Sequence, residues 1–203
     1  MTNRIEQIIA MEWKLFDQVQ NIGGRASCQD NGKEFHIMRS SQLMAWSEGM
    51  CDSYYEDLLT ADLQGRNPLA EKYGYMMERT NPLEFVRIKD QLPPRTAEKD
   101  AIIDRMCQVH VGWLETLTEQ YPHLAGRGRP IHQSEDTPYA TSFETYLWGE
   151  LATYSLKTLQ QYDAYVQQLE AQGKNMNLMV LENTTKQYGY ASLEEAEQAL
   201  AGN

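Results

Sequence analysis

The sequence lacks a long apolar run. Across its 203 residues no hydrophobic stretch approaches the about 20 residues that a helix needs to span a bilayer. The first segment, MTNRIEQIIAMEWKLF, is amphipathic and contains acids, which is unlike a secretory signal. We therefore expect a soluble, cytoplasmic protein that does not enter membranes.

Cysteine is scarce, and the familiar cofactor motifs are missing. The three cysteines, Cys28, Cys51 and Cys107, are odd in number and lack the spacing of a metal site, so reduced thiols are expected. Cys-x-x-Cys, His-x-x-x-His and the Glu-x-x-His pairs of di-iron bundles do not occur. The glycine-rich loops of Walker and Rossmann type are also missing. The sequence therefore assigns no metal ligands and leaves the cofactor unknown.

Positive charge is in short supply. The chain has 18 lysines and arginines against 29 aspartates and glutamates, which gives a formal net charge of −11. Such a field repels the phosphates of nucleic acids and of anionic membranes. We therefore expect no nucleic-acid partner.

The sequence also lacks strand-like patterns, because β-branched residues are sparse and polar and apolar residues do not alternate. Apolar residues recur instead at helical spacing, and the breaks carry caps such as Asn67, Thr96 and Ser192. The pattern predicts helices over residues 3–19, 35–62, 82–89 and 143–172, one between Thr96 and Tyr121, and others from Pro68, Met176 and Ser192. One stretch, HLAGRGRPIHQSEDTPYATS at about 123–142, has no period and is predicted to be a long polar loop. The fold class is thus all-α, with about seven helices in a single bundle-like domain over residues 1–203.

Several polar residues fall where helical periodicity predicts the core. Glu12 lies on the apolar face of the first helix, His36 and Arg39 on that of the second, and Glu150 borders that of the late helix. A buried carboxylate must be paired or hydrogen-bonded. One interpretation is an internal ion pair that joins helices, and the other is a polar cavity in which the carboxylates act as ligands or general bases. His110 also faces inward, where a core histidine is the favoured interpretation.

Glycine–arginine pairs recur at helix breaks and in the polar loop. Three of them end in Arg25, Arg127 and Arg129. Glycine lets the backbone approach a ligand closely, and the planar guanidinium fits carboxylate or phosphate. These pairs predict an anion site in an otherwise acidic protein.

Cys28 lies in the first of these elements, eight residues before His36. A Cys/His nucleophile pair is one interpretation, and a structural thiol is the commoner one. A mononuclear metal site that combines Glu12 and His36 with a loop acid is the least favoured alternative.

The chain also resembles a bacterial family. The matching stretches are MEWKLFDQVQNIGGRASCQDN, MRSSQLMAW, GRNPLAEKYGYMMERTNP, GRGRP, SFETYLWGELATYSLKTL and YGYASLEEAE. With these stretches the chain resembles DUF4125, a family without an assigned activity. Some members look to be joined to a nucleotidyltransferase-like domain, which implies such a protein as a partner.

The leading hypothesis is a site for a small anionic ligand such as a phosphate ester, nucleotide or carboxylate. If a reaction occurs there, Glu12, Cys28 and His36 are the candidate catalytic residues. The candidate ligand-binding residues are Arg25, Gln29, Arg39, Gln42, Arg127, Arg129, Glu144 and Glu150. The alternatives are a non-catalytic helical module that docks on the nucleotidyltransferase-like partner, and a thiol or metal sensor.

Overall fold

Side-chain caps determine where most helices begin. In the computed structural model, Asn67, Thr96 and Ser192 each accept a hydrogen bond from a backbone N–H in the first turn of the following helix, which confirms three predicted caps. Pro68 and Pro82 open two helices, although the side chain of Asn81 makes no cap hydrogen bond.

The structure describes residues 2–20, 24–126, 128–137 and 140–202. In these residues there are ten α-helices: α1 (Thr2–Asp17), α2 (Gly32–Met44), α3 (Glu48–Leu63), α4 (Pro68–Thr80), α5 (Pro82–Ile88), α6 (Ala97–Gln120), α7 (Phe143–Ala152), α8 (Leu156–Ala171), α9 (Met176–Gln187) and α10 (Leu193–Ala201). They also contain three short 3-10 helices, η1 (Ser27–Asp30), η2 (Lys89–Gln91) and η3 (Gln133–Glu135). The described chain forms no strand, only an isolated bridge between Thr137 and Ala140. The all-α class is therefore confirmed.

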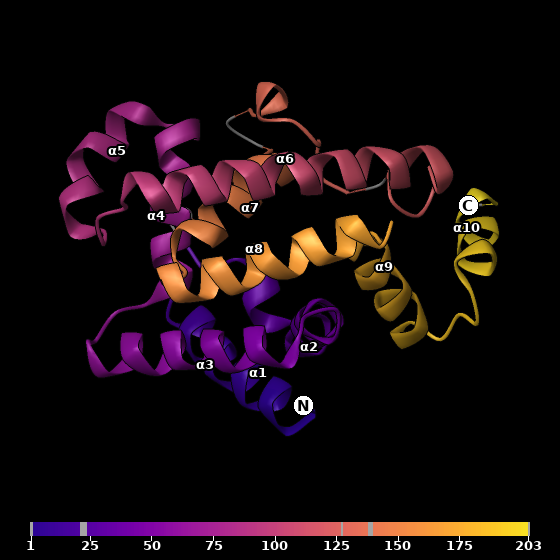
Figure 1. Cartoon of the computed structure of the whole chain (residues 1–203), viewed down its shortest axis with the longest axis horizontal. Coiled ribbons are helices and arrows are strands. Elements are labelled where there is room, and N and C mark those ends of the chain that lie inside the picture. The colour runs from indigo at the N-terminus through magenta and orange to yellow at the C-terminus, as the bar shows by residue number, and fades with distance from the viewer. Residues whose placement is uncertain (1, 21–23, 127, 138–139, 203) are drawn as a thin grey trace.

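The longest helix, α6, spans 24 residues and runs along one side of the molecule (Figure 1). α8 lies beside it and packs on α3 with its other face. α7 packs against both α4 and α6, while α2 packs against α1 and α9. Among the helices of the described residues, none has both the length and the apolar content needed to cross a lipid bilayer.

The prediction of about seven helices is wrong, because two predicted long helices are each divided in two. The stretch 35–62 breaks after Met44, where Ser47 caps α3, and the stretch 143–172 breaks after Ala152, where Ser155 caps α8. Trp46 and Tyr154 lie inside these breaks yet are almost wholly buried. The apolar pattern therefore continues across each break and conceals the change of direction.

The predicted polar loop after α6 has little regular structure, but two of its carboxylates fix its conformation through hydrogen bonds. Glu135 accepts hydrogen bonds from the backbone N–H groups of Ile131 and His132. Asp136 accepts from the backbone N–H of Ser142 and from the hydroxyl of Thr145 at the start of α7. The bonds of Glu135 thus lie within the loop, and those of Asp136 attach the described part of the loop to the start of α7.

α4 and α7 approach each other closely at Gly149. A Cβ atom at this position would lie 2.5 Å from Cγ of Met76 and 3.0 Å from the carbonyl oxygen of Lys72. Only a residue without a side chain therefore permits this helix spacing.

We predict that Gly149→Ala lowers the free energy of unfolding by about 1 to 3 kcal/mol, because overpacking outweighs the gain in helix propensity. Gly112 of α6 is the matched control, since a Cβ atom there would meet nothing within 4 Å. Gly112→Ala should raise the stability by up to about 1 kcal/mol. Urea denaturation followed by circular dichroism measures both, and equal stability of the two variants would contradict the close approach.

Candidate functional site

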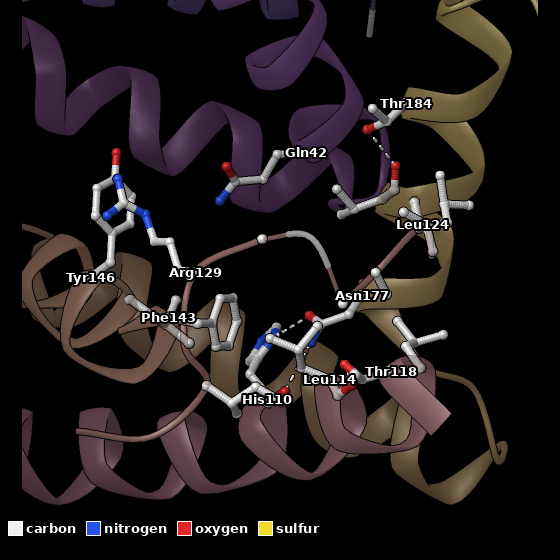
Figure 2. A pocket seen from close by; sticks show the side chains of 18 of the residues that line it. Gln42, His110, Leu114, Thr118, Leu124, Arg129, Phe143, Tyr146, Asn177 and Thr184 are labelled. Carbon is white, nitrogen blue, oxygen red and sulfur yellow. Dashed lines mark hydrogen bonds between the residues drawn. The ribbon is translucent and has the colours of Figure 1, made fainter. Parts of the chain in front are cut away.

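A large cavity lies beside the polar loop, between α2, α6, α7 and α9 (Figure 2). Its volume is about 1290 Å³. Arg129 from the loop, Tyr146 and Glu150 from α7, and Gln42 from α2 line its polar part. Two segments that are about a hundred residues apart in sequence therefore meet at this end of the cavity.

Arg129 is held against an aromatic ring. Its Cζ atom lies 4.5 Å from the ring centroid of Tyr146, and its Nη1 donates to the carbonyl of Thr141 at 3.2 Å. The Nζ atom of Lys72 lies 3.6 Å from the centroid of the same ring. Within the described ranges no carboxylate forms an ion pair with Arg129. Two cations thus share one ring, and Arg129 retains an uncompensated charge.

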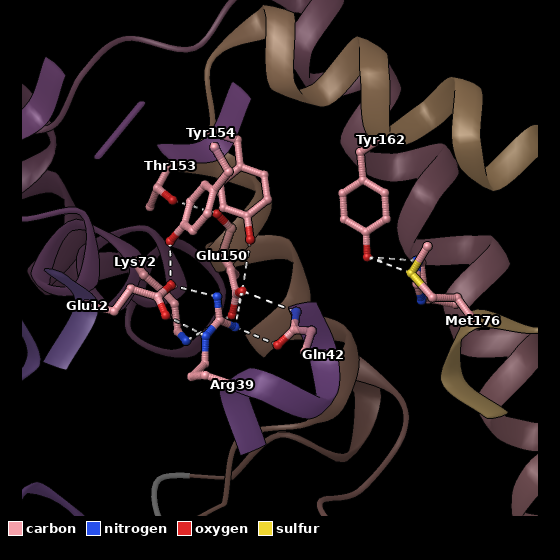
Figure 3. Close-up of polar contacts among 11 residues, drawn as sticks. Glu12, Arg39, Gln42, Lys72, Glu150, Thr153, Tyr154, Tyr162 and Met176 are labelled. Atoms are coloured by element: carbon pink, nitrogen blue, oxygen red, sulfur yellow. Dashed lines mark hydrogen bonds and ion pairs between the residues drawn. The ribbon is translucent and has the colours of Figure 1, made fainter. Parts of the chain in front are cut away.

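Behind this end of the cavity lies a buried cluster of charges (Figure 3). Arg39 of α2 makes two hydrogen bonds to the carboxylate of Glu12 of α1, at 2.6 and 2.8 Å. The hydroxyl of Tyr54 donates to the same carboxylate at 2.7 Å, and Glu12 is only 2% exposed. This planar two-bond geometry is among the strongest that proteins offer to a carboxylate.

Arg39 also reaches a second carboxylate, Glu150 of α7, at 3.0 Å. Lys72 of α4 approaches the other oxygen of Glu150 at 3.1 Å, and Tyr154 donates to Glu150 at 2.9 Å. The amide oxygen of Gln42 accepts from Arg39. The cluster therefore joins α1, α2, α4 and α7 through two acids and two bases whose formal charges cancel.

Burial and pairing act in opposite directions on these groups. Burial alone would raise the pKa of Glu150, but Lys72 and then Arg39 outweigh it and hold that pKa well below its usual range. Burial would lower the pKa of Lys72, but Tyr146 and Glu150 outweigh it and raise that pKa. Glu150 and Lys72 are consequently both charged at neutral pH.

His110 lies in the wall of the cavity (Figure 2). Asn177 donates its amide N–H to the carbonyl of His110 at 2.8 Å, so its amide oxygen accepts from the Nδ1–H of His110 at 2.7 Å. Nε2 is then free to accept from the hydroxyl of Tyr162 at 3.3 Å. Burial lowers the pKa of His110 to about 4, which keeps the ring neutral. The core-histidine interpretation is confirmed, and the ring also borders the cavity.

The other predicted residues of the first glycine–arginine element have structural partners. Arg25 pairs with Asp17 at 2.6 Å and with Asp30 at 2.7 Å, on the surface and away from the cavity lining. Gln29 is buried and donates to the carbonyls of Phe16 and Val19 beyond the end of α1. Both side chains fix the connection between α1 and α2.

Cys28 is an exposed free thiol, and His36 pairs with Glu6 of α1 at 3.0 Å. The inward orientation predicted for His36 is wrong, because its side chain is 44% exposed at the outer seam of α1 and α2. Neither Cys28 nor His36 is among the residues that line the cavity.

Glu144 lies outside the cavity lining, where it accepts a backbone hydrogen bond from Gln133 and lies 3.7 Å from Arg79. Arg127 falls outside the described residues. Nowhere in the part of the chain that the structure describes do three or more histidines, cysteines or acids gather as a metal site.

Sequence reasoning missed Lys72 and Tyr146, which complete the polar end. Both lie in stretches on which the family resemblance rests, AEKYGY and SFETYLWGEL. Tyr146 stands four residues before Glu150, one helical turn away on the same face, and this spacing could have identified it.

We predict that Arg39→Met destabilises the protein by about 3 to 5 kcal/mol, because it leaves Glu12 with Tyr54 as its remaining donor and removes one of the cations of Glu150. Lys157→Met is the control: it breaks the exposed ion pair with Glu56 and should leave the unfolding midpoint unchanged. Urea denaturation measures both. Similar midpoints for the two variants would show that the buried cluster contributes no more than a surface pair.

We also predict a pH dependence that originates at His110. Its folded-state pKa of about 4 lies below the ordinary 6.5, so the unfolded chain takes up a proton first as the pH falls. The contribution of neutral His110 to the free energy of unfolding is fully present above about pH 6.5 and is lost as the pH falls toward 4. Between pH 7 and pH 5 the free energy of unfolding of the wild type should fall by about 2 kcal/mol more than that of His110→Gln. Parallel urea titrations at both pH values measure the difference, and equal losses would contradict the assignment.

Comparison with known proteins gives a family and no characterised relative. No curated protein and no solved structure matches the chain. The family model DUF4125, described as a protein of unknown function, matches residues 2–198, and the chain therefore belongs to the DUF4125 family.

Proposed function

We propose that this protein binds a small anionic molecule in the cavity, with Arg129 as the contact to its anionic group. The observation that carries the proposal is the charge balance of the wall. Arg129 is the sole lysine or arginine among the described residues of the lining, and it has no carboxylate partner there. A guanidinium in this state binds carboxylates and phosphates well, so carboxylates, phosphate esters and nucleotides are the ligand classes to test.

The neighbouring acids do not cancel this charge. Glu150 also lines the cavity, but Lys72 and Arg39 already pair with it. Glu135 points its carboxylate at two backbone N–H groups. The ring of Tyr146 orients the guanidinium through a cation–π contact, and because the ring is uncharged it does not neutralise Arg129.

The remaining predicted residues support this site in different ways. Gln42 lines the cavity directly, whereas Glu12 and Arg39 position Gln42 and Glu150 from behind. Arg39 and Tyr54 occupy both oxygens of Glu12, which favours a structural role over that of a general base. We therefore propose binding rather than turnover.

We expect Arg129→Gln to weaken the binding of an anionic ligand by about 10- to 100-fold, since a hydrogen bond to a charged group contributes roughly 1.5–3 kcal/mol. A panel of inorganic phosphate, nucleoside monophosphates and linear carboxylates is titrated into the protein and followed calorimetrically. Arg25→Gln removes an arginine outside the cavity lining and is the matched control. The proposal fails if no anion binds, or if both variants bind like the wild type.

One observation favours the alternative of a docking module. Leu83 and Val86 of α5 are 83% and 61% exposed, and no residue of this helix is buried. An apolar surface of this kind suits a protein partner such as the nucleotidyltransferase-like protein. A pure docking module would bind none of the anions, so the same titration separates the two proposals.

A further inference from the structure

The cavity is much larger than an anion site requires. Its volume of about 1290 Å³ exceeds the roughly 300–1,000 Å³ of common ligand pockets. A phosphate or a short carboxylate at Arg129 would leave most of this space empty. The rest of the wall must therefore define the rest of the ligand.

Beyond the polar end, the wall is mainly apolar. It is formed by residues of α6, the loop, α7 and α9, among them Leu114, Leu117, Ile131, Phe143, Val180 and Leu181. In Figure 2, Arg129 and Tyr146 stand at one side of the cavity, Leu124 and Thr184 at the other, and Phe143 and His110 between them. The one charged side chain that Figure 2 labels, Arg129, thus stands at one side of the cavity, and the residues labelled at the other side carry no charge.

Two polar side chains farther along the wall, His110 and Asn177, carry no charge. His110 is neutral, and Asn177 and Tyr162 satisfy its ring nitrogens. The hydroxyl of Thr185 is buried and has no hydrogen-bond partner in the described part of the protein. An orphaned hydroxyl of this kind is rare, and it adds no charge to this part of the wall.

From this layout we infer that the ligand is an amphipathic acid. Its anionic head contacts Arg129 and Gln42, and its apolar chain lies along Phe143 and His110 toward Leu114 and Val180. This inference rests on the proposed function and specifies its ligand class. The driving force for the chain is removal of apolar surface from water, so affinity should rise with chain length.

The test is a calorimetric titration with hexanoate, octanoate and decanoate, each below its micellar concentration. Each added methylene should tighten binding about fourfold, the ratio that corresponds to ~0.8 kcal/mol per buried methylene. Decyl phosphate in place of decanoate reports which anionic head is preferred, and binding of either supports the inference. An affinity that does not change with chain length overturns it.

Two variants locate the chain and the head. Leu114→Trp fills the apolar part of the cavity. It should weaken the binding of decanoate at least tenfold and the binding of hexanoate less. Thr116→Trp adds the same side chain to the same helix outside this cavity, and it should bind like the wild type. Arg129→Gln should weaken the binding of all three acids by the same factor. If Leu114→Trp does not fold, Val180→Trp fills the same space from α9.

The outcomes separate this inference from the proposed function. If phosphate and hexanoate bind as tightly as decanoate and depend on Arg129, the anion site stands and the amphipathic ligand is wrong. If decanol binds as tightly as decanoate and Arg129→Gln has no effect, the anion site is wrong. If none of these compounds binds, both are wrong.

Discussion

The double contact of Arg39 with Glu12 and Glu150 is the interaction on which the arrangement of the first four helices and α7 depends. A buried carboxylate without a partner costs several kcal/mol, and here two of them share one guanidinium. Lys72 supplies the fourth charge, so the cluster is balanced only when α1, α2, α4 and α7 are all in place. The ion pairs are directional, and for that reason they select one relative placement of helices whose apolar faces could pack in several ways.

The cluster also explains why Arg129 can act as an anion contact. Lys72 is committed to Glu150 and to one ring, Tyr146, and the same ring supports Arg129. The close approach of α4 and α7 at Gly149 brings Lys72 within reach of this ring and of Glu150. A neutral cluster beneath a single unpaired arginine gives one end of the cavity a positive charge inside a protein of net charge −11.

Part of this site could be predicted from the sequence. The helical period of α1 placed Glu12 in the core, and the period of α2 placed Arg39 there, since both lie on the lines of their apolar neighbours. The same reasoning failed for His36, which faces Glu6 at the surface. The glycine–arginine pattern led to Arg25, whose charge is satisfied by Asp17 and Asp30. Local patterns identify a residue type and a face, but not the partner that comes from another helix.

The sequence by itself determined the helical class, the caps at Asn67, Thr96 and Ser192, and the burial of the apolar stripes, because these follow from hydrogen bonds and periodicities within about one turn. Only the tertiary structure decided that the chain changes direction at Ser47 and Ser155, since Trp46 and Tyr154 are buried inside these breaks and the apolar pattern continues across them. It alone also brought Arg129 beside Tyr146 and left a cavity between α6 and α9. Those features depend on contacts between distant segments, and their energies are set by the packing of whole helices rather than by any local stretch of residues.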